Sequence, residues 1–205
     1  MARIFLVRHA ESVANTRGIF QGQTYDTDLS PLGRRQAAAL AHRFAGERFD
    51  AVYTSPLKRT RQTALPLGAA IDEPALLETN HGAWESRSKT AIQSRWPDLY
   101  AQWLSHPGTV EFPKGELFSA TRDRVVTWFD RLSTTDQTIV AVTHSNVIMA
   151  LLTHVFDKPL DAMWQYAMQP TAVTLIESHS PAKIIYLNDI SHLNGLQSDL
   201  ATHAL

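Results

Sequence analysis

Short runs of apolar and β-branched residues recur along the chain, and such runs are typical of buried strands. Four of them, separated by segments of helical spacing, cover residues 3–7, 51–54, 75–77 and 138–142. Two later runs, at residues 171–176 and 183–187, predict a closing pair of strands. Strands that alternate with helices predict an α/β domain with a mostly parallel sheet.

Helix signals stand between these runs. A serine followed by a proline suits the N-cap and the first helical position, and this pair occurs at residues 30–31 and 55–56. Apolar positions at helical spacing predict helices over residues 116–132 and 147–155. The stretch from 84 to about 115, rich in tryptophan and proline, predicts a small helical cap inserted over one end of the sheet.

No internal repeat, low-complexity segment or linker interrupts the sequence. A chain of 205 residues fits one domain with a full hydrophobic core. We therefore predict a single domain over residues 1–205, a three-layer α/β/α fold with the cap as an insert.

Composition and charge narrow the class of function. The sequence is 44% hydrophobic, carries a formal net charge of -1 and contains no cysteine. That charge favours neither nucleic acid nor a membrane as a partner, and no apolar run is long enough to span a bilayer. The lack of cysteine excludes disulfides, cysteine-ligated zinc and a cysteine nucleophile. We expect a cytoplasmic protein.

Reactive side chains follow the four predicted parallel strands. Arg8 and His9 follow the first, Arg59 lies shortly after the second, Glu78 follows the third and His144 the fourth. Ligands of open α/β sheets bind beyond the carboxyl ends of the strands. We therefore expect these five side chains to share one rim of the sheet.

Such a rim suits a phosphate monoester, which carries about two negative charges near neutral pH. Arg8 and Arg59 can hold its oxygens with bidentate donors. One histidine can attack phosphorus while the other donates a hydrogen bond to the transferring group. The leaving alkoxide needs a proton, and Glu78 can supply it if its surroundings raise its pKa.

Five blocks in fixed order resemble the histidine phosphatase superfamily, also called the phosphoglycerate mutase-like superfamily. They are Leu-Val-Arg-His-Ala-Glu-Ser at 6–12 with Asn15, then residues 28–37, 55–64, 78–85 and 142–144. The resemblance implies a phosphohistidine intermediate on His9, with Glu78 as proton donor and no metal or other cofactor. It implies a phosphate pocket of Arg8, Asn15, Arg59 and His144.

Within the superfamily, the spacing most resembles small phosphatases, especially the metal-independent phosphoserine phosphatases. Segments 21–22, 80–84 and 187–193 carry this likeness. It suggests further substrate contacts from Gln21, Gly22, His81 and His192. The departures from the family pattern are Ala10, Ser86, Leu117, Ser145 and Asn146, of which Ser145 and Asn146 replace two usual glycines.

Other interpretations remain open for several side chains. His81 could simply shape a turn before Gly82, and His192 could lie in a tail that covers the site. Glu85 lies farther past the third strand than Glu78 does. We expect surface or structural roles for the other histidines, His42, His106, His154, His179 and His203, and we expect the tryptophans to be core residues.

The favoured function is a phosphatase for a small phosphorylated metabolite, with phosphoserine as the best single substrate. The alternatives are a cofactor-dependent phosphoglycerate mutase, a broad-specificity acid or sugar phosphatase, and a phosphate-binding relative without activity. The chain is short for a mutase, whose insert and tail tend to be longer. A homodimer is plausible for this family.

A metal hydrolase with His9, Glu78 and His144 as ligands is a further alternative, but the sequence has no His-Glu-x-x-His motif. We therefore predict that EDTA leaves the hydrolysis of p-nitrophenyl phosphate unchanged. The rate with and without chelator checks this. A loss of activity that added divalent metal restores would establish the metal alternative instead.

Overall fold

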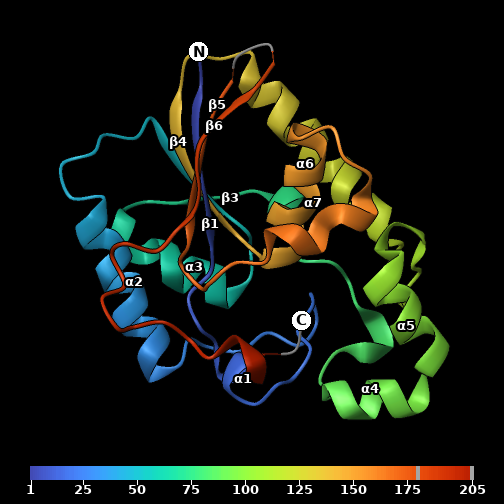
Figure 1. Ribbon diagram of the computed structural model, residues 1–205. Coiled ribbons are helices and arrows are strands. Elements are labelled where there is room, and N and C mark those ends of the chain that lie inside the picture. Colours follow the sequence, from blue (N-terminus) through green and yellow to red (C-terminus); the bar gives the residue numbers. More distant parts are fainter. Residues whose placement is uncertain (179–180, 204–205) are drawn as a thin grey trace.

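A central sheet organises the fold of this computed structural model, which describes residues 1–178 and 181–203. Within these residues the sheet has six strands in the order β3-β2-β4-β1-β5-β6 (Figure 1). The strands are β1 (Arg3–Arg8), β2 (Ala51–Thr54), β3 (Ile71–Asp72), β4 (Thr138–Thr143), β5 (Val173–Glu177) and β6 (Lys183–Asp189). β1 to β4 run parallel, whereas β5 and β6 pair antiparallel. The predicted mostly parallel α/β fold is thus confirmed.

Helices cover both faces of the sheet. α2 (Pro31–Arg43) and α3 (Lys58–Ala64) lie on one side, and α6 (Phe118–Ser133) and α7 (Ser145–Val155) lie on the other (Figure 1). The predicted helix that opens with Ser30 and Pro31 is confirmed, because the Ser30 hydroxyl accepts a hydrogen bond from the Gly33 amide at 2.9 Å.

Alternating side chains of β1 divide the core into two layers. Phe5 and Val7 belong to the cluster that includes residues of α2 and α3, whereas Ile4 and Leu6 join the larger cluster beneath α6 and α7. Successive side chains of a strand point to opposite faces, so a run that is apolar throughout serves both layers. The continuous apolar pattern of residues 3–7 follows from this double burial.

The predicted cap contains α4 (Lys89–Arg95) and α5 (Pro97–Ser105), which lie beside the carboxyl end of the sheet (Figure 1). Aromatic rings attach it to the body: Trp103 lies 4.9 Å from Phe118 and 5.1 Å from Trp164, centroid to centroid. The remaining helices are α1 (Val13–Thr16) and short 3₁₀ helices at Leu65–Leu67, Pro74–Leu76, Gly82–Trp84, Pro107–Thr109, Leu160–Tyr166 and Leu200–Thr202.

Two local predictions are wrong. The run 75–77 falls mainly in the 3₁₀ helix Pro74–Leu76, and the third strand is the two-residue β3 before it. A proline at the first position and a single buried leucine, Leu76, suit this turn better than a strand. Ser55 and Pro56 do not start a helix either, because α3 begins at Lys58 with Leu57 as its N-cap.

Among the described residues, none of the helices combines the length and the apolar character needed to cross a bilayer. His179 lies outside the described residues, so its predicted surface or structural role is not addressed.

The start of α2 packs closely on the loop that follows β1. The Ser30 amide donates to the Glu11 carbonyl at 2.9 Å, and the Ser30 hydroxyl donates to the Glu11 carboxylate at 2.6 Å. A Cβ atom at Gly33 would stand only 2.0 Å from the same Glu11 carbonyl oxygen. Glycine at this position therefore lets the helix approach the loop that carries His9.

We predict that Gly33→Ala lowers the free energy of unfolding by about 1–3 kcal/mol, because the new methyl group forces two backbone segments apart. For a chain of this size, each kcal/mol lowers the melting temperature by about 2–4 °C. Gly108→Ala is the matched control, because its nearest neighbour atom would lie at 3.4 Å. Calorimetry that finds equal melting temperatures for the two variants would refute the close-approach argument.

Candidate active site

A cleft at the carboxyl ends of the parallel strands gathers the predicted reactive side chains. Its empty space, open mouth included, is about 420 Å³. Five of the six predicted catalytic and phosphate-binding residues line it: Arg8, His9, Asn15, Arg59 and Glu78. His144 lies just behind them, with its ring centroid 5.2 Å from that of His9.

His9 is held with one ring nitrogen available. Its Nδ1 lies 2.7 Å from the Ala10 carbonyl oxygen, which can only accept, so Nδ1 carries the proton and Nε2 the free electron pair. Burial, followed by the charges of Arg59 and Arg8, lowers the pKa of His9 well below 6.5. The imidazole is therefore neutral and nucleophilic near neutral pH.

The Arg8 side chain is fixed by groups from distant parts of the chain. Its Nη1 donates to the Met168 carbonyl, and its Nη2 lies 3.2 Å from His203 Nδ1. Burial lowers the pKa of Arg8 to about 10, so the guanidinium stays charged near pH 7. His203 is neutral there, because burial and the Arg8 charge lower its pKa to about 4, and its Nδ1 accepts from Arg8.

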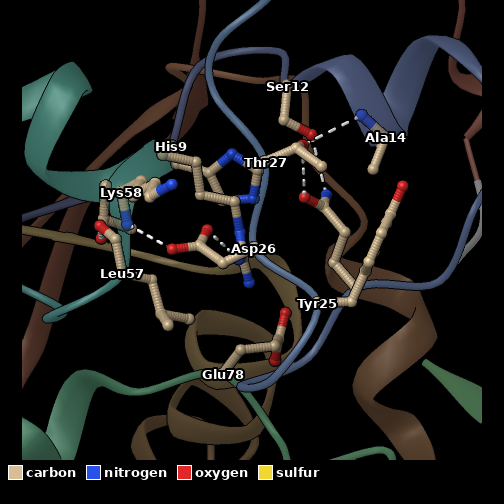
Figure 2. A network of polar contacts seen from close by, with 12 residues as sticks. His9, Ser12, Ala14, Tyr25, Asp26, Thr27, Leu57, Lys58 and Glu78 are labelled. Atoms are coloured by element: carbon tan, nitrogen blue, oxygen red, sulfur yellow. Dashed lines mark hydrogen bonds and ion pairs between the residues drawn. The ribbon is translucent and has the colours of Figure 1, made fainter. Parts of the chain in front are cut away.

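Arg59 is fully buried and is oriented by the loop that precedes α2. Its Nη1 donates to Asp26 Oδ1 at 2.8 Å and its Nη2 to the Gly22 carbonyl at 3.1 Å. Asp26 also accepts from the Lys58 amide at 2.6 Å (Figure 2). The Asp26 carboxylate thus connects the loop to the start of α3. Together with the Gly22 carbonyl it fixes the direction of the Arg59 guanidinium.

The two ring nitrogens of His144 face different groups, and Nδ1 is the one on the side of Glu78. Its Nε2 lies 2.9 Å from the Ser55 hydroxyl, and its buried Nδ1 has no hydrogen-bond partner among the described residues. Burial and the charge of Arg59 lower its pKa well below 6.5. If the Ser55 hydroxyl donates to Nε2, Nδ1 carries the proton that His144 can offer to a ligand.

Glu78 reaches the cleft from a turn instead of a strand end. It follows the 3₁₀ helix Pro74–Leu76, and its Oε1 accepts from the Thr79 amide at 2.8 Å. Its Oε2 lies 4.0 Å from His144 Nδ1. Both Glu78 and His9 line the cleft. Glu78 thus lies beside the histidines as predicted, but it follows a 3₁₀ helix and not the end of a strand.

Of the four predicted substrate-binding residues, Gln21 and His81 are among the lining residues of the cleft, and Gly22 and His192 are not. Gln21 and His81 line the cleft, and His81 Nδ1 lies 2.6 Å from the Gln21 carbonyl. Gly22 contributes its carbonyl to Arg59 and leaves no room for a Cβ, which would stand 2.1 Å from Glu85 Oε1. His192 is not among the lining residues; its Nε2 lies 3.3 Å from the Thr171 hydroxyl.

Two nearby polar side chains organise the surrounding loops. Asn15 Oδ1 accepts from the amide and the hydroxyl of Ser12, so its NH₂ group is what it can offer to the cleft. The Glu85 carboxylate accepts from three consecutive amides, those of residues 23–25. Glu85 therefore holds the loop that contains Asp26, and unlike Glu78 it is not among the residues that line the cleft.

Three side chains that orient the reactive groups are not predicted from the sequence. Asp26 holds Arg59, Ser55 contacts His144, and His203 contacts Arg8. The Ser-Pro pair at Ser55 is a misleading signal, because it imitates a helix start. Asp26 and His203 carry no local pattern that distinguishes them from other loop residues.

Comparison with known proteins places this chain in a defined family. A model of the histidine phosphatase superfamily (branch 1) matches residues 4–189, and the chain belongs to that superfamily. It is accordingly an enzyme that acts on phosphomonoesters.

Individual relatives cover most of the chain. Phosphoserine phosphatase 1 of Hydrogenobacter thermophilus is 32% identical over 201 residues, which span 94% of this chain and 95% of that protein. The adenosylcobalamin/alpha-ribazole phosphatase of Escherichia coli is 31% identical over 174 residues, 80% of this chain and 84% of that one. The solved structure of Bacillus stearothermophilus YhfR has a TM-score of 0.89 at 27% identity, covering 95% of this chain and 100% of that one.

We predict that the His9 imidazole stays neutral as the pH falls through 6.5. A lowered pKa means that the protonated form, which cannot attack, accumulates only well below that pH. Nitrogen-15 NMR of the imidazoles, with His9 assigned by its loss in His9→Gln, should show no titration between about pH 8 and about pH 6. A midpoint near 6.5 would mean that burial and the two buried cations do not lower the pKa of His9 as described.

Proposed function

We propose that the chain is a phosphatase that hydrolyses a small phosphomonoester through a phosphohistidine on His9, without a metal ion. The observation that carries the proposal is the state of His9: Nδ1 is bound to the Ala10 carbonyl, and the pKa is lowered by burial and by two arginines. A neutral imidazole among fixed positive charges is suited to attack a phosphate dianion.

Binding of the substrate is assigned to the charged and polar groups of the cleft. The phosphoryl oxygens are held by the guanidinium groups of Arg8 and Arg59, by the Asn15 NH₂ group and by His144 Nδ1–H. Both guanidinium groups are oriented before the substrate arrives, so little reorganisation accompanies binding. The apolar side chains Ile19, Phe20 and Trp103 form part of the remaining wall.

The reaction then has two steps. In the first, the Nε2 electron pair of His9 forms a bond to phosphorus while the ester P–O bond breaks, and protonated Glu78 gives its proton to the leaving oxygen. In the second, Glu78 takes a proton from a water molecule whose oxygen attacks phosphorus. The P–N bond breaks, the electron pair returns to His9, and inorganic phosphate leaves.

Phosphoserine is our best single substrate. Its support is the similarity over almost the whole chain to a relative named phosphoserine phosphatase. An alpha-ribazole phosphate is the second candidate, favoured by the similarity to the E. coli phosphatase. A comparison of kcat/KM for phosphoserine, alpha-ribazole phosphate, sugar phosphates and 3-phosphoglycerate distinguishes them. Formation of 2-phosphoglycerate from 3-phosphoglycerate would favour the mutase alternative, and release of phosphate the phosphatase.

We predict that His9→Ala lowers the hydrolysis of p-nitrophenyl phosphate by about a thousandfold or more, because no other group replaces the nucleophile. His42→Ala, at an exposed histidine of α2, is the matched control and should keep the wild-type rate. Circular dichroism should show both variants folded.

The same pair of variants tests the covalent intermediate. Brief incubation of wild type and His42→Ala with a ³²P-labelled phosphomonoester should leave acid-labile, base-stable label on the protein, as a P–N bond requires. His9→Ala should carry none. Wild-type turnover in His9→Ala, or label that survives the substitution, would show that the nucleophile is assigned wrongly.

A further inference from the structure

Two side chains of the cleft carry polar atoms that no group within residues 1–178 and 181–203 satisfies. Ser145 and Asn146, the first two residues of α7, line the cleft and are 3% and 6% exposed. The Ser145 hydroxyl and Asn146 Oδ1 are buried and have no hydrogen-bond partner in the part of the chain that the structure describes. Such atoms cost stability, so their presence in a cleft points to a ligand that satisfies them.

The orientation of the Asn146 amide follows from its neighbours. The Gln21 carbonyl can only accept, so His81 Nδ1, at 2.6 Å, carries the ring proton. In the neutral ring Nε2 is then an acceptor, and the Asn146 Nδ2 group 3.4 Å away is its donor. The opposite atom of the amide, Oδ1, remains as a pure acceptor in the wall of the cleft.

An acceptor is unusual in a cleft whose phosphate-binding part is cationic. Arg8 and Arg59 attract anionic oxygens, which Asn146 Oδ1 cannot bind because it has no proton to give. Its complement is an N–H or O–H group elsewhere on the substrate. His81 is itself fixed, with its ring edge-on to Phe112 at 4.7 Å between centroids, so the amide is held by a rigid support.

We propose that Asn146, with the Ser145 hydroxyl beside it, selects phosphomonoesters whose leaving group carries a hydrogen-bond donor, an ammonium or a hydroxyl group. This inference rests on the proposed phosphatase function and specifies its substrate class. A leaving group that lacks the donor leaves Oδ1 unsatisfied, and sites built around a hydrogen bond discriminate strongly against such analogues.

A substrate series tests the assignment directly. L-phosphoserine carries the ammonium group, 3-phosphoglycerate carries a hydroxyl in its place, and 3-phosphonooxypropanoate carries only hydrogen. We expect wild type to prefer each donor-bearing substrate over 3-phosphonooxypropanoate by about tenfold or more in kcat/KM. In Asn146→Leu, which keeps the bulk but loses the acceptor, both ratios should fall toward one.

Two further variants separate the hydrogen bond from packing. Asn146→Asp keeps an acceptor oxygen and should keep the preference for the donor-bearing substrates. Gln93→Leu makes the same type of amide-to-leucine change on the exposed surface of α4 and should keep the wild-type ratios. Should Asn146→Leu fail to fold, Ser145→Ala provides a smaller change that should lower the ratios in the same direction.

Wild-type ratios near one, or ratios that Asn146→Leu and Ser145→Ala leave unchanged, would overturn the inference while leaving the phosphatase proposal intact. Failure of the wild-type protein to release phosphate from every substrate of the series, the donor-bearing ones included, would instead count against the phosphatase proposal.

Discussion

Burial of two guanidinium groups is the constraint on which this site depends. Arg8 and Arg59 are 1% and 0% exposed, and removing such ions from water costs several kcal/mol each. Backbone carbonyls and the Asp26 carboxylate offset part of this cost while fixing both side chains. The remaining positive charge has two effects. It attracts an anion, and, after burial itself, it lowers the pKa values of the neighbouring imidazoles of His9 and His144 and so favours their neutral form.

The sequence is most informative where burial is two-sided. A strand that serves both core layers must be apolar throughout, so β1 and β4 are easily recognised, and so are the residues that follow them. The carboxyl ends of parallel strands meet at one edge, which is why Arg8, His9 and His144 can be grouped without a structure. Glu78 is grouped correctly for a wrong reason, because a buried leucine in a 3₁₀ turn resembles the end of a short strand.

The residues that orient these groups could not be found in the same way. Ser55 and His144 are 89 positions apart, and Arg8 and His203 are 195 apart. Neither pair belongs to a periodic segment, so no spacing rule connects them. The amide of Asn146 depends likewise on His81 and, through it, on the Gln21 carbonyl. Each of these contacts is decided by how loops cross above the sheet, which hydrophobic periodicity does not encode.

The contact between Arg8 and His203 also depends on the order in which the chain is synthesised. At about 5–20 residues per second, the ribosome adds His203 roughly 10–40 s after Arg8. During that interval the Arg8 side chain of a nascent chain lacks the contact with His203, even where the sheet around Arg8 has already formed. The Arg8 contact thus depends on a residue that is added 195 positions later, well after all the residues of β1.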